Sequence, residues 1–214
     1  MQDALDFGLL AFASLFTMID PLGIVPLFLT MTQGLDREHM NRIAFKATLT
    51  ALAILIFIAF TGRAVFEFFG ISINSLRIVG GIIFLIIGYD MLQAHIARTK
   101  KSDESSQEYA DDIAITPLAI PMICGPGAIT SMIVFSGDAS TMPRQMALFG
   151  ALAAVILITY LALRGAKYLM RVIGPNGSRV LLRLMGLIVM SVAVEFLLSG
   201  LTPVLREIFM VNGG

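Results

Sequence analysis

Apolar residues follow one another along this chain in long stretches that short polar segments separate. A helix that spans about 30 Å of hydrocarbon needs roughly 20 apolar residues, so stretches near that length are candidate membrane spans. Six such stretches occur, each with few or no charged side chains: 7–32, 43–68, 71–92, 113–137, 145–163 and 180–203. The pattern predicts an all-α polytopic membrane protein with six transmembrane helices.

A charged connector divides the chain into two halves. Residues 98–112 read RTKKSDESSQEYADD, which is rich in charge and poor in apolar side chains, as is typical of a solvated linker. We expect this connector to lie in the cytoplasm and to separate one three-helix unit, 1–97, from a second, 113–214.

The two halves resemble each other at a nearly constant offset. Pro21 aligns with Pro126 at an offset of 105, and SLRIVGGI (75–82) aligns with LLRLMGLI (181–188) at an offset of 106. A fixed spacing of this kind indicates an internal duplication. Because each half would cross the membrane three times, the second must enter from the opposite face. We therefore expect two inverted three-helix repeats.

Basic residues are distributed unevenly between the two sides of a six-span topology. Eleven of the 15 fall on one side, within 37–46, 98–101 and 164–183, and four on the other. Cytoplasmic loops carry the excess of Lys and Arg, which predicts that both termini lie outside. If the first and fourth stretches were re-entrant and did not cross, the division would be 8 to 7 and the bias would vanish.

Helix-opening residues interrupt the first and fourth stretches, at MIDPLG (18–23) and PMICGPG (121–127). Proline removes an amide donor and clashes with the preceding turn, and glycine adds no rigidity. Opened backbone is tolerated in hydrocarbon only where protein or a water-filled cavity satisfies its polar groups. We expect helices 1 and 4 to be broken at midmembrane, which in inverted halves indicates the binding site of a transporter.

The two breaks differ in their helix caps. Asp20–Pro21 and Gly125–Pro126 each fit an N-cap followed by a first-position proline. The Asp20 carboxylate can satisfy amides around Gly23, whereas Gly125 leaves the next amides free for an anion. Our hypothesis is that the second break holds a substrate carboxylate while Asp20 meets a substrate ammonium or a coupling proton. The alternative is that Asp20 only caps a kinked helix. The candidate binding residues are Asp20, Pro21, Leu22, Gly23, Cys124, Gly125, Pro126, Gly127 and Ala128.

Other residues inside the stretches favour structural roles. Arg77 and Arg183 lie near the starts of equivalent segments, where long basic side chains usually extend to the interface. Glu195 lies deeper, so we expect a partner for it, either an arginine or a polar cavity, and name it as a second candidate coupling site. The glycines at 80, 81 and 186 are expected to allow close helix packing.

Composition agrees with a membrane protein and excludes several other classes. The chain is 57% hydrophobic and 14% charged, against about 45–50% and 25% in ordinary soluble domains. Zero net charge gives no sign of nucleic-acid binding, and a single cysteine excludes an internal disulfide. Two isolated histidines form no metal-ligand pattern, and neither lies in a broken segment where it could activate a nucleophile. We expect no metal, no cofactor and no enzymatic activity.

The broken segments resemble one known family. IDPLGIVPLFLTMT (19–32) and IPMICGPGAITSMI (120–133) are similar to the MarC family of bacterial and archaeal inner-membrane proteins, also called the small neutral amino acid transporter or SnatA type. The resemblance covers essentially the whole chain. It implies a secondary transporter of small neutral amino acids such as glycine and alanine, with proton coupling, in the cytoplasmic membrane. A passive channel or a membrane-embedded subunit without its own substrate is the alternative, and the oligomeric state is left open.

Overall fold

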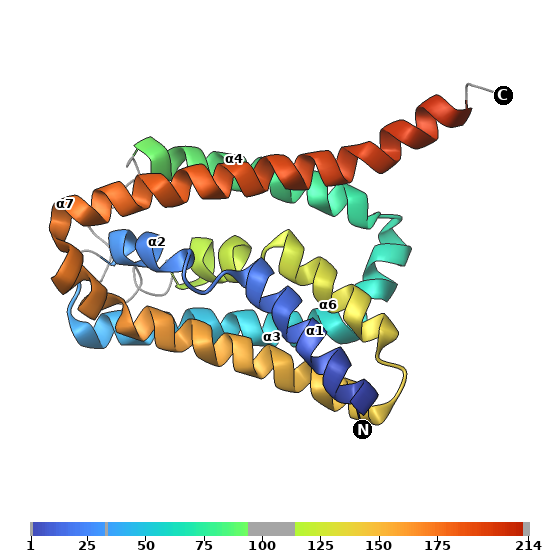
Figure 1. Ribbon diagram of the computed structural model, residues 1–214, viewed down its shortest axis with the longest axis horizontal. Helices are drawn as coiled ribbons and strands as arrows, with labels where there is room; N and C mark the ends of the chain where they lie inside the picture. The colour runs from blue at the N-terminus through green and yellow to red at the C-terminus, as the bar shows by residue number, and fades with distance from the viewer. Residues whose placement is uncertain (1, 33, 94–113, 212–214) are drawn as a thin grey trace.

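A computed structural model describes residues 2–32, 34–93 and 114–211, and every element within these ranges is helical (Figure 1). The elements are α1 (Gln2–Ile19), α2 (Ile24–Met31), α3 (Arg37–Phe69), α4 (Ile73–Gln93), η1 (Ala114–Ile123), α6 (Pro126–Asp138) and α7 (Met142–Val211). The connector predicted at 98–112 lies outside the described residues.

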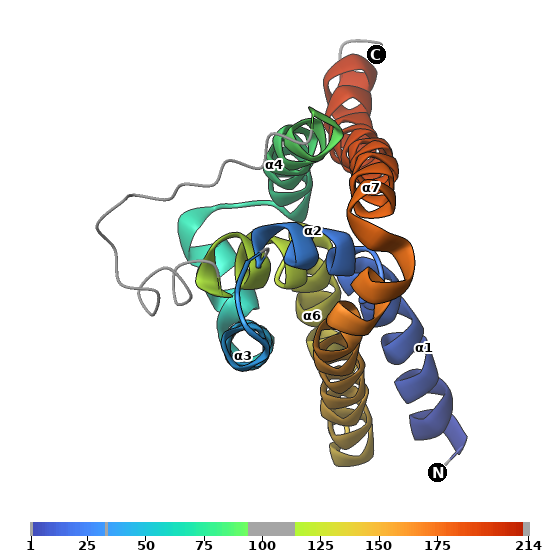
Figure 2. The ribbon, with the colours of Figure 1, turned by 90° about the vertical axis from the view of Figure 1, so that its left-hand side faces the viewer.

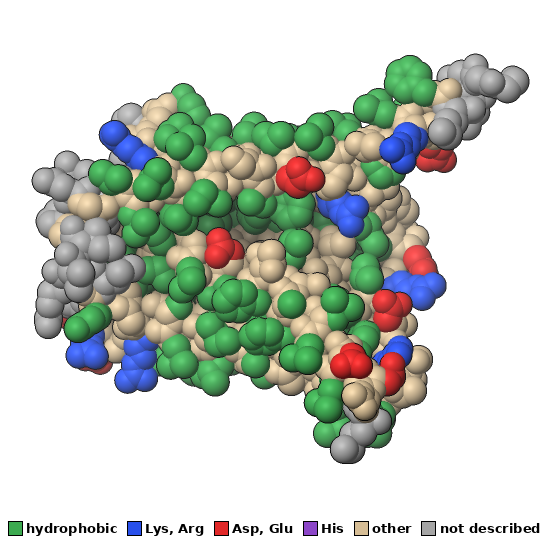
Figure 3. Space-filling view, viewed as in Figure 1, with side chains coloured by type: hydrophobic (Ala, Val, Ile, Leu, Met, Phe, Trp, Pro, Cys, Tyr) green, Lys and Arg blue, Asp and Glu red, His purple; other side chains and the backbone are tan. Residues whose placement is uncertain are grey.

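Five of these helical stretches are long and apolar enough to cross a membrane: Gln2–Ile19, Arg37–Phe69, Ile73–Gln93, Met142–Ala166 and Val180–Phe209. A sixth results if η1 and α6, which meet at a bend of 57°, form one span. Large apolar side chains cover much of the surface, and isolated acidic side chains lie among them (Figure 3). A soluble monomer exposes apolar patches of only a few hundred Å². The all-α polytopic prediction is confirmed, with five or six candidate spans.

Helix α7 folds back on itself at Gly174. This glycine has φ 70° and ψ 175°, a conformation that side-chain-bearing residues rarely adopt. We call residues 142–173 the first limb and 175–211 the second limb. The bend lies at the end of the molecule opposite to both chain termini (Figure 1). The predicted fifth and sixth helices therefore occur as two limbs of one bent element.

Helix α4 and the second limb run side by side in opposite directions (Figures 1 and 2). Small residues bring the two backbones together at intervals of seven residues. A methyl group on Gly81 would lie 2.8 Å from the Ala193 carbonyl oxygen, and one on Gly186 would lie 2.8 Å from both the Gly88 oxygen and the Leu92 nitrogen. The predicted close packing at Gly81 and Gly186 is confirmed, because only glycine fits these approaches.

The two halves of the chain exchange their first segments. Helices α1 and α2 pack on α7, whereas η1 packs on α3, and α6 packs on both α3 and α4. Among the described residues, α1 and α2 make no comparably extensive contact with α3 or α4. Fully buried side chains from both halves fill the interior, including Leu15, Phe28, Ile43, Met132 and Leu152. Each half thus supplies long helices that enclose the irregular segment of the other.

The start of α3 carries a conventional cap. The Asp36 carboxylate accepts a hydrogen bond from the His39 backbone amide at 2.8 Å and lies 2.7 Å from its imidazole Nδ1. The hydrogen bond from the His39 backbone amide, and after it the contact with the imidazole, lower the pKa of Asp36 below its ordinary value. Asp36 is therefore a local stabiliser of α3 at neutral pH.

Candidate functional site

The first break consists of residues 20–23, which form a turn between α1 and α2. Asp20 has φ 47°, and its Oδ1 accepts a hydrogen bond from the Gly23 amide at 3.1 Å. A methyl group on Gly23 would overlap the same carboxylate, so a larger residue there would displace the group that closes the turn. The predicted hydrogen bond between the carboxylate and an amide near Gly23 is confirmed, but the N-cap of α2 is Gly23 and not Asp20. Regular helix begins at Ile24 and not at Pro21, because residues 21–23 are used in the turn that the carboxylate closes.

A cavity of about 640 Å³ opens beside the first break. Its walls come from the turn, from α2 and from both limbs of α7: Asp20, Leu22, Gly23, Val25, Pro26, Leu161, Ala162, Gly165, Ala166, Leu181, Met185 and Ile188. The carboxylate of Asp20 is the one charged group in this set, and the other side chains are apolar. Asp20 is exposed, and Leu22 is 70% exposed. The cavity therefore offers one negative charge in apolar surroundings.

The second break is buried. Helix α6 begins at Pro126 with Gly125 as its N-cap, in extended backbone and without any side-chain cap bond, as the sequence predicted. The Cys124 thiol donates to the Ala51 carbonyl oxygen at 3.3 Å, and a methyl group on Gly125 would lie 2.8 Å from the Phe84 ring. A methyl group on Gly80 would overlap the Pro126 ring. Helices α3 and α4 thus enclose the start of α6.

The end of α1 and the start of α6 lie against each other. A methyl group on Gly127 would lie 2.6 Å from the Met18 sulfur and 2.8 Å from the Phe196 ring. The structure therefore brings the two breaks together, although in different environments. Asp20, Leu22 and Gly23 line the cavity, while Pro21 and residues 124–128 are buried. The first-turn amides of α6 at Gly127 and Ala128 have no intrahelical acceptor, which leaves buried donors at this junction.

Thr130 is a further polar residue near the second break that the sequence analysis did not single out. It is 7% exposed, and its Oγ1 has no hydrogen-bond partner among the described residues. Its position, four residues after Pro126 and three after Gly127, places it on the same helix face as both. Its signal in the sequence was a hydroxyl one turn into a helix that lacks a side-chain cap.

Glu195 lies in a separate, shallow depression of about 490 Å³ whose other walls are Leu198, Ser199, Thr202, Pro203 and Arg206. No hydrogen bond or ion pair joins Glu195 to another described residue. The polar surroundings expected for this carboxylate are present, and the close arginine partner is not. The depression shares no residue with the cavity beside Asp20.

Titratable groups do not cluster in the described part of the chain. No group of three or more His, Cys, Asp or Glu residues is placed there to hold a metal ion. The described part of the chain offers instead one carboxylate in the wall of the cavity, one uncapped helix start that is buried, and one buried hydroxyl without a partner.

Comparison with known proteins agrees with this architecture. The profile of the MarC family integral membrane proteins matches residues 5–205. The chain belongs to the MarC family. Relatives of this MarC chain include the UPF0056 membrane protein MJ1677 of Methanocaldococcus jannaschii, which is 37% identical over 92% of the chain and 97% of the relative. YvbG of Bacillus subtilis is 36% identical over 92% and 96%, and YhcE of Escherichia coli is 34% identical over 89% of each chain.

The family assignment fixes the class of protein and its setting. MarC proteins are integral membrane proteins, and the relatives of this chain come from both bacteria and archaea. The names of these relatives describe membrane proteins and state no substrate. No solved structure matches the chain.

Proposed function

We propose that this MarC chain is a secondary transporter that moves small neutral amino acids of the glycine and alanine class, coupled to protons, across the cytoplasmic membrane. The substrate class rests on the family resemblance of the two motifs. The observation that carries the transport mechanism is the contact between the breaks, in which Gly127 at the uncapped start of α6 lies on Met18, two residues before Asp20.

The two breaks supply complementary chemistry for a zwitterion. A substrate carboxylate would accept hydrogen bonds from the free amides of Gly127 and Ala128, where the helix dipole also favours an anion. The ammonium group, or a coupling proton, would meet the carboxylate of Asp20. Both charges need partners in apolar surroundings, because an unpaired buried charge is costly. Glycines next to the groups that would bind the substrate favour a substrate with a small side chain.

The arrangement of the halves supports an alternating-access mechanism. We interpret 1–97 and 113–214 as inverted repeats whose first segments are the broken helices of a transporter, with the termini outside and the connector in the cytoplasm. The exchange of these segments between the halves means that each break is enclosed by helices of the other half. A movement of one half against the other would therefore change access to both breaks together.

The test is transport by purified protein in liposomes with an imposed proton gradient. We expect accumulation of glycine or alanine that Asp20→Asn abolishes, because the amide cannot exchange a proton. Asparagine keeps an oxygen acceptor for the Gly23 amide, so the fold should be retained. Asp90→Asn is the matched control, since Asp90 is an exposed acid of another membrane helix, α4.

Three outcomes would each refute a different part of the proposal. If the wild-type protein moves no small neutral amino acid, the substrate class is wrong. If Asp20→Asn transports with the wild-type pH profile, Asp20 is only a cap. Flux that follows the substrate gradient and ignores the proton gradient would identify a passive channel.

A further inference from the structure

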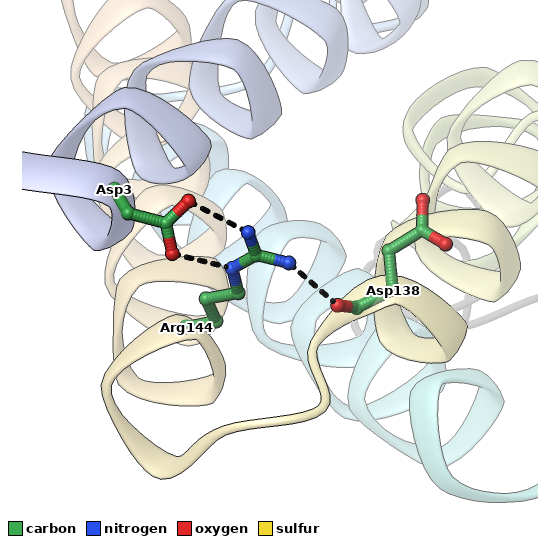
Figure 4. Close-up of polar contacts among 3 residues, drawn as sticks. All are labelled: Asp3, Asp138 and Arg144. Atoms are coloured by element: carbon green, nitrogen blue, oxygen red, sulfur yellow. Dashed lines mark hydrogen bonds and ion pairs between the residues drawn. The ribbon is translucent and has the colours of Figure 1, made fainter.

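Three helices meet at one guanidinium group at the end of the molecule that carries both termini (Figure 4). Arg144, near the start of α7, donates from Nη2 to Asp3 Oδ1 at 2.7 Å and from Nε to Asp3 Oδ2 at 2.9 Å. Its Nη1 donates to the carbonyl oxygen of Asp138, the last residue of α6, at 3.3 Å. Arg144 thereby ties the starts of α1 and α7 to the end of α6.

Apolar contacts continue this closure toward the breaks. The Phe7 ring lies 5.3 Å below the Arg144 guanidinium and meets the Phe135 ring edge to face at 5.6 Å between centroids. A methyl group on Gly8 would lie 3.1 Å from the Ala147 side chain. Farther along α1, Ala11 and Leu15 are completely buried. On this side of the first break, α1 is therefore packed against α6 and α7.

The opposite end of the molecule is more open. The cavity beside Asp20 takes its walls from residues 20–26, 161–166 and 181–188, which all lie between the first break and the bend at Gly174. None of these residues precedes Asp20 in α1 or belongs to the first turns of α7. The open space and the closed contacts thus lie on opposite sides of the same break.

We propose that Arg144 is a latch that holds the termini end closed, and that the structure represents the state in which the site opens toward the Gly174 end. This inference rests on the proposed transport function. It adds a residue that favours the state open toward the Gly174 end over the state open toward the termini end. Asp3 belongs to the first half and Arg144 to the second, so the ion pair joins the two units whose relative movement transport requires.

The exposure of the pair suits a reversible contact. The Arg144 side chain is 30% exposed and the Asp3 side chain is 71% exposed, so water can replace each partner when the helices part. Ion pairs that remain accessible to water stabilise one arrangement only modestly. The bidentate geometry adds orientation, because the planar guanidinium matches both carboxylate oxygens. A latch of this kind shifts a conformational equilibrium without locking it.

Cysteine accessibility tests the latch without any substrate. In a Cys124→Ala background, a reporter cysteine is introduced by Ala11→Cys, at a completely buried position of α1 on the closed side. A second reporter, Gly165→Cys, lies in the cavity wall at a position with open space around it. Labelling rates are measured in liposomes with a water-soluble maleimide. With the latch intact, the reporter at 165 should react readily and the one at 11 slowly.

Breaking the latch should change the two rates in opposite directions. We expect Arg144→Gln or Asp3→Asn to raise labelling at position 11 at least tenfold and to lower it at 165. The exchanged pair, Asp3→Arg with Arg144→Asp, should restore the wild-type rates. Arg63→Gln is the matched control, because Arg63 and Glu67 form an ion pair at 2.9 Å within α3 that does not join two helices.

The possible results of labelling and transport separate the latch from the proposed transport function. Unchanged labelling at position 11, or a rise at both positions that indicates general loosening, would overturn the latch. Opposite changes in the two rates without transport of any amino acid would support the latch and refute the proposed substrate. Transport with unchanged labelling in Arg144→Gln would support the proposed function and refute the latch.

Discussion

Replacing Thr130 by valine should stabilise the empty protein and weaken substrate binding. Thr130 is 7% exposed, and its hydroxyl has no partner among the described residues. Valine has nearly the same shape and no polar atom, so the exchange removes a desolvated group without opening a cavity. A residue that destabilises the resting fold in this way is typical of a functional site, where strain or unmet polar groups serve the ligand.

The expected magnitudes follow from the cost of a buried, unpaired hydroxyl. That cost is about 1–3 kcal/mol in protein mutational data, and partial relaxation leaves an expected gain of about 1 kcal/mol for valine. In a chain of this size such a gain raises the melting temperature by about 2–4 °C. If the bound substrate hydrogen-bonds to Thr130, losing one neutral bond of about 0.5–1.5 kcal/mol weakens affinity roughly 2- to 13-fold.

Thermal unfolding of the detergent-purified protein, with and without glycine or alanine, measures both effects. A ligand that binds only the folded state raises the melting temperature, and the dependence on ligand concentration gives the affinity. Thr159→Val is the matched control, because Thr159 is completely buried but its hydroxyl already donates to the Val155 carbonyl oxygen at 2.8 Å. A lower melting temperature for Thr130→Val than for Thr159→Val, both without ligand, would refute the reasoning.

Two further predictions concern the fold. Gly186→Ala should lower the free energy of unfolding by about 1–3 kcal/mol, because its methyl group would lie 2.8 Å from two backbone atoms of α4. Gly150→Ala is the control and should be neutral or stabilising, because Gly150 has open space around it on α7. The unfolding midpoints of the two variants are compared with that of the wild type. Asp36→Ala should lower the melting temperature at pH 7. Because the pKa of Asp36 is lowered on folding, its stabilisation is present above the ordinary carboxyl pKa and is lost as pH falls through the lower value, so the two melting curves should converge in acid.

The sequence predicted the features of the fold that depend on local composition. Span lengths follow from the thickness of hydrocarbon, so α3, α4 and the two limbs of α7 lie over the predicted apolar stretches, although the helices extend up to ten residues beyond them. Two separate spans were predicted here and are found, but the helical backbone that continues through residues 164–179 on both sides of the bend at Gly174 was not predicted. Charged residues in that segment indicated a loop, but helical backbone tolerates charge outside the apolar spans, and only Gly174 departs from it.

For the site too, features that depend on the local sequence were predicted and features that depend on tertiary packing were not. The cap at Gly125 and the bond between Asp20 and the Gly23 amide were predicted, because each acts within one turn of its own residue, whereas the start of α2 at Ile24 was not. The burial of the second break was not predictable, since it depends on Gly80 and Phe84 of α4, more than 35 residues earlier in the chain. The unpaired hydroxyl of Thr130 was also out of reach, because satisfaction of a polar group is a property of the packed structure.

The exchange of the first segments between the two halves would couple the proposed latch to the site. The first break meets its cavity against α7 of the second half, and the second break is enclosed by α3 and α4 of the first half. If the halves move against each other, as the proposed mechanism requires, the surroundings of both breaks change together. The ion pair between Asp3 and Arg144 crosses this same boundary. Because Asp3 lies in the first turn of α1 and Asp20 directly follows its last residue, one uninterrupted helix joins the proposed latch to the turn that forms the first break.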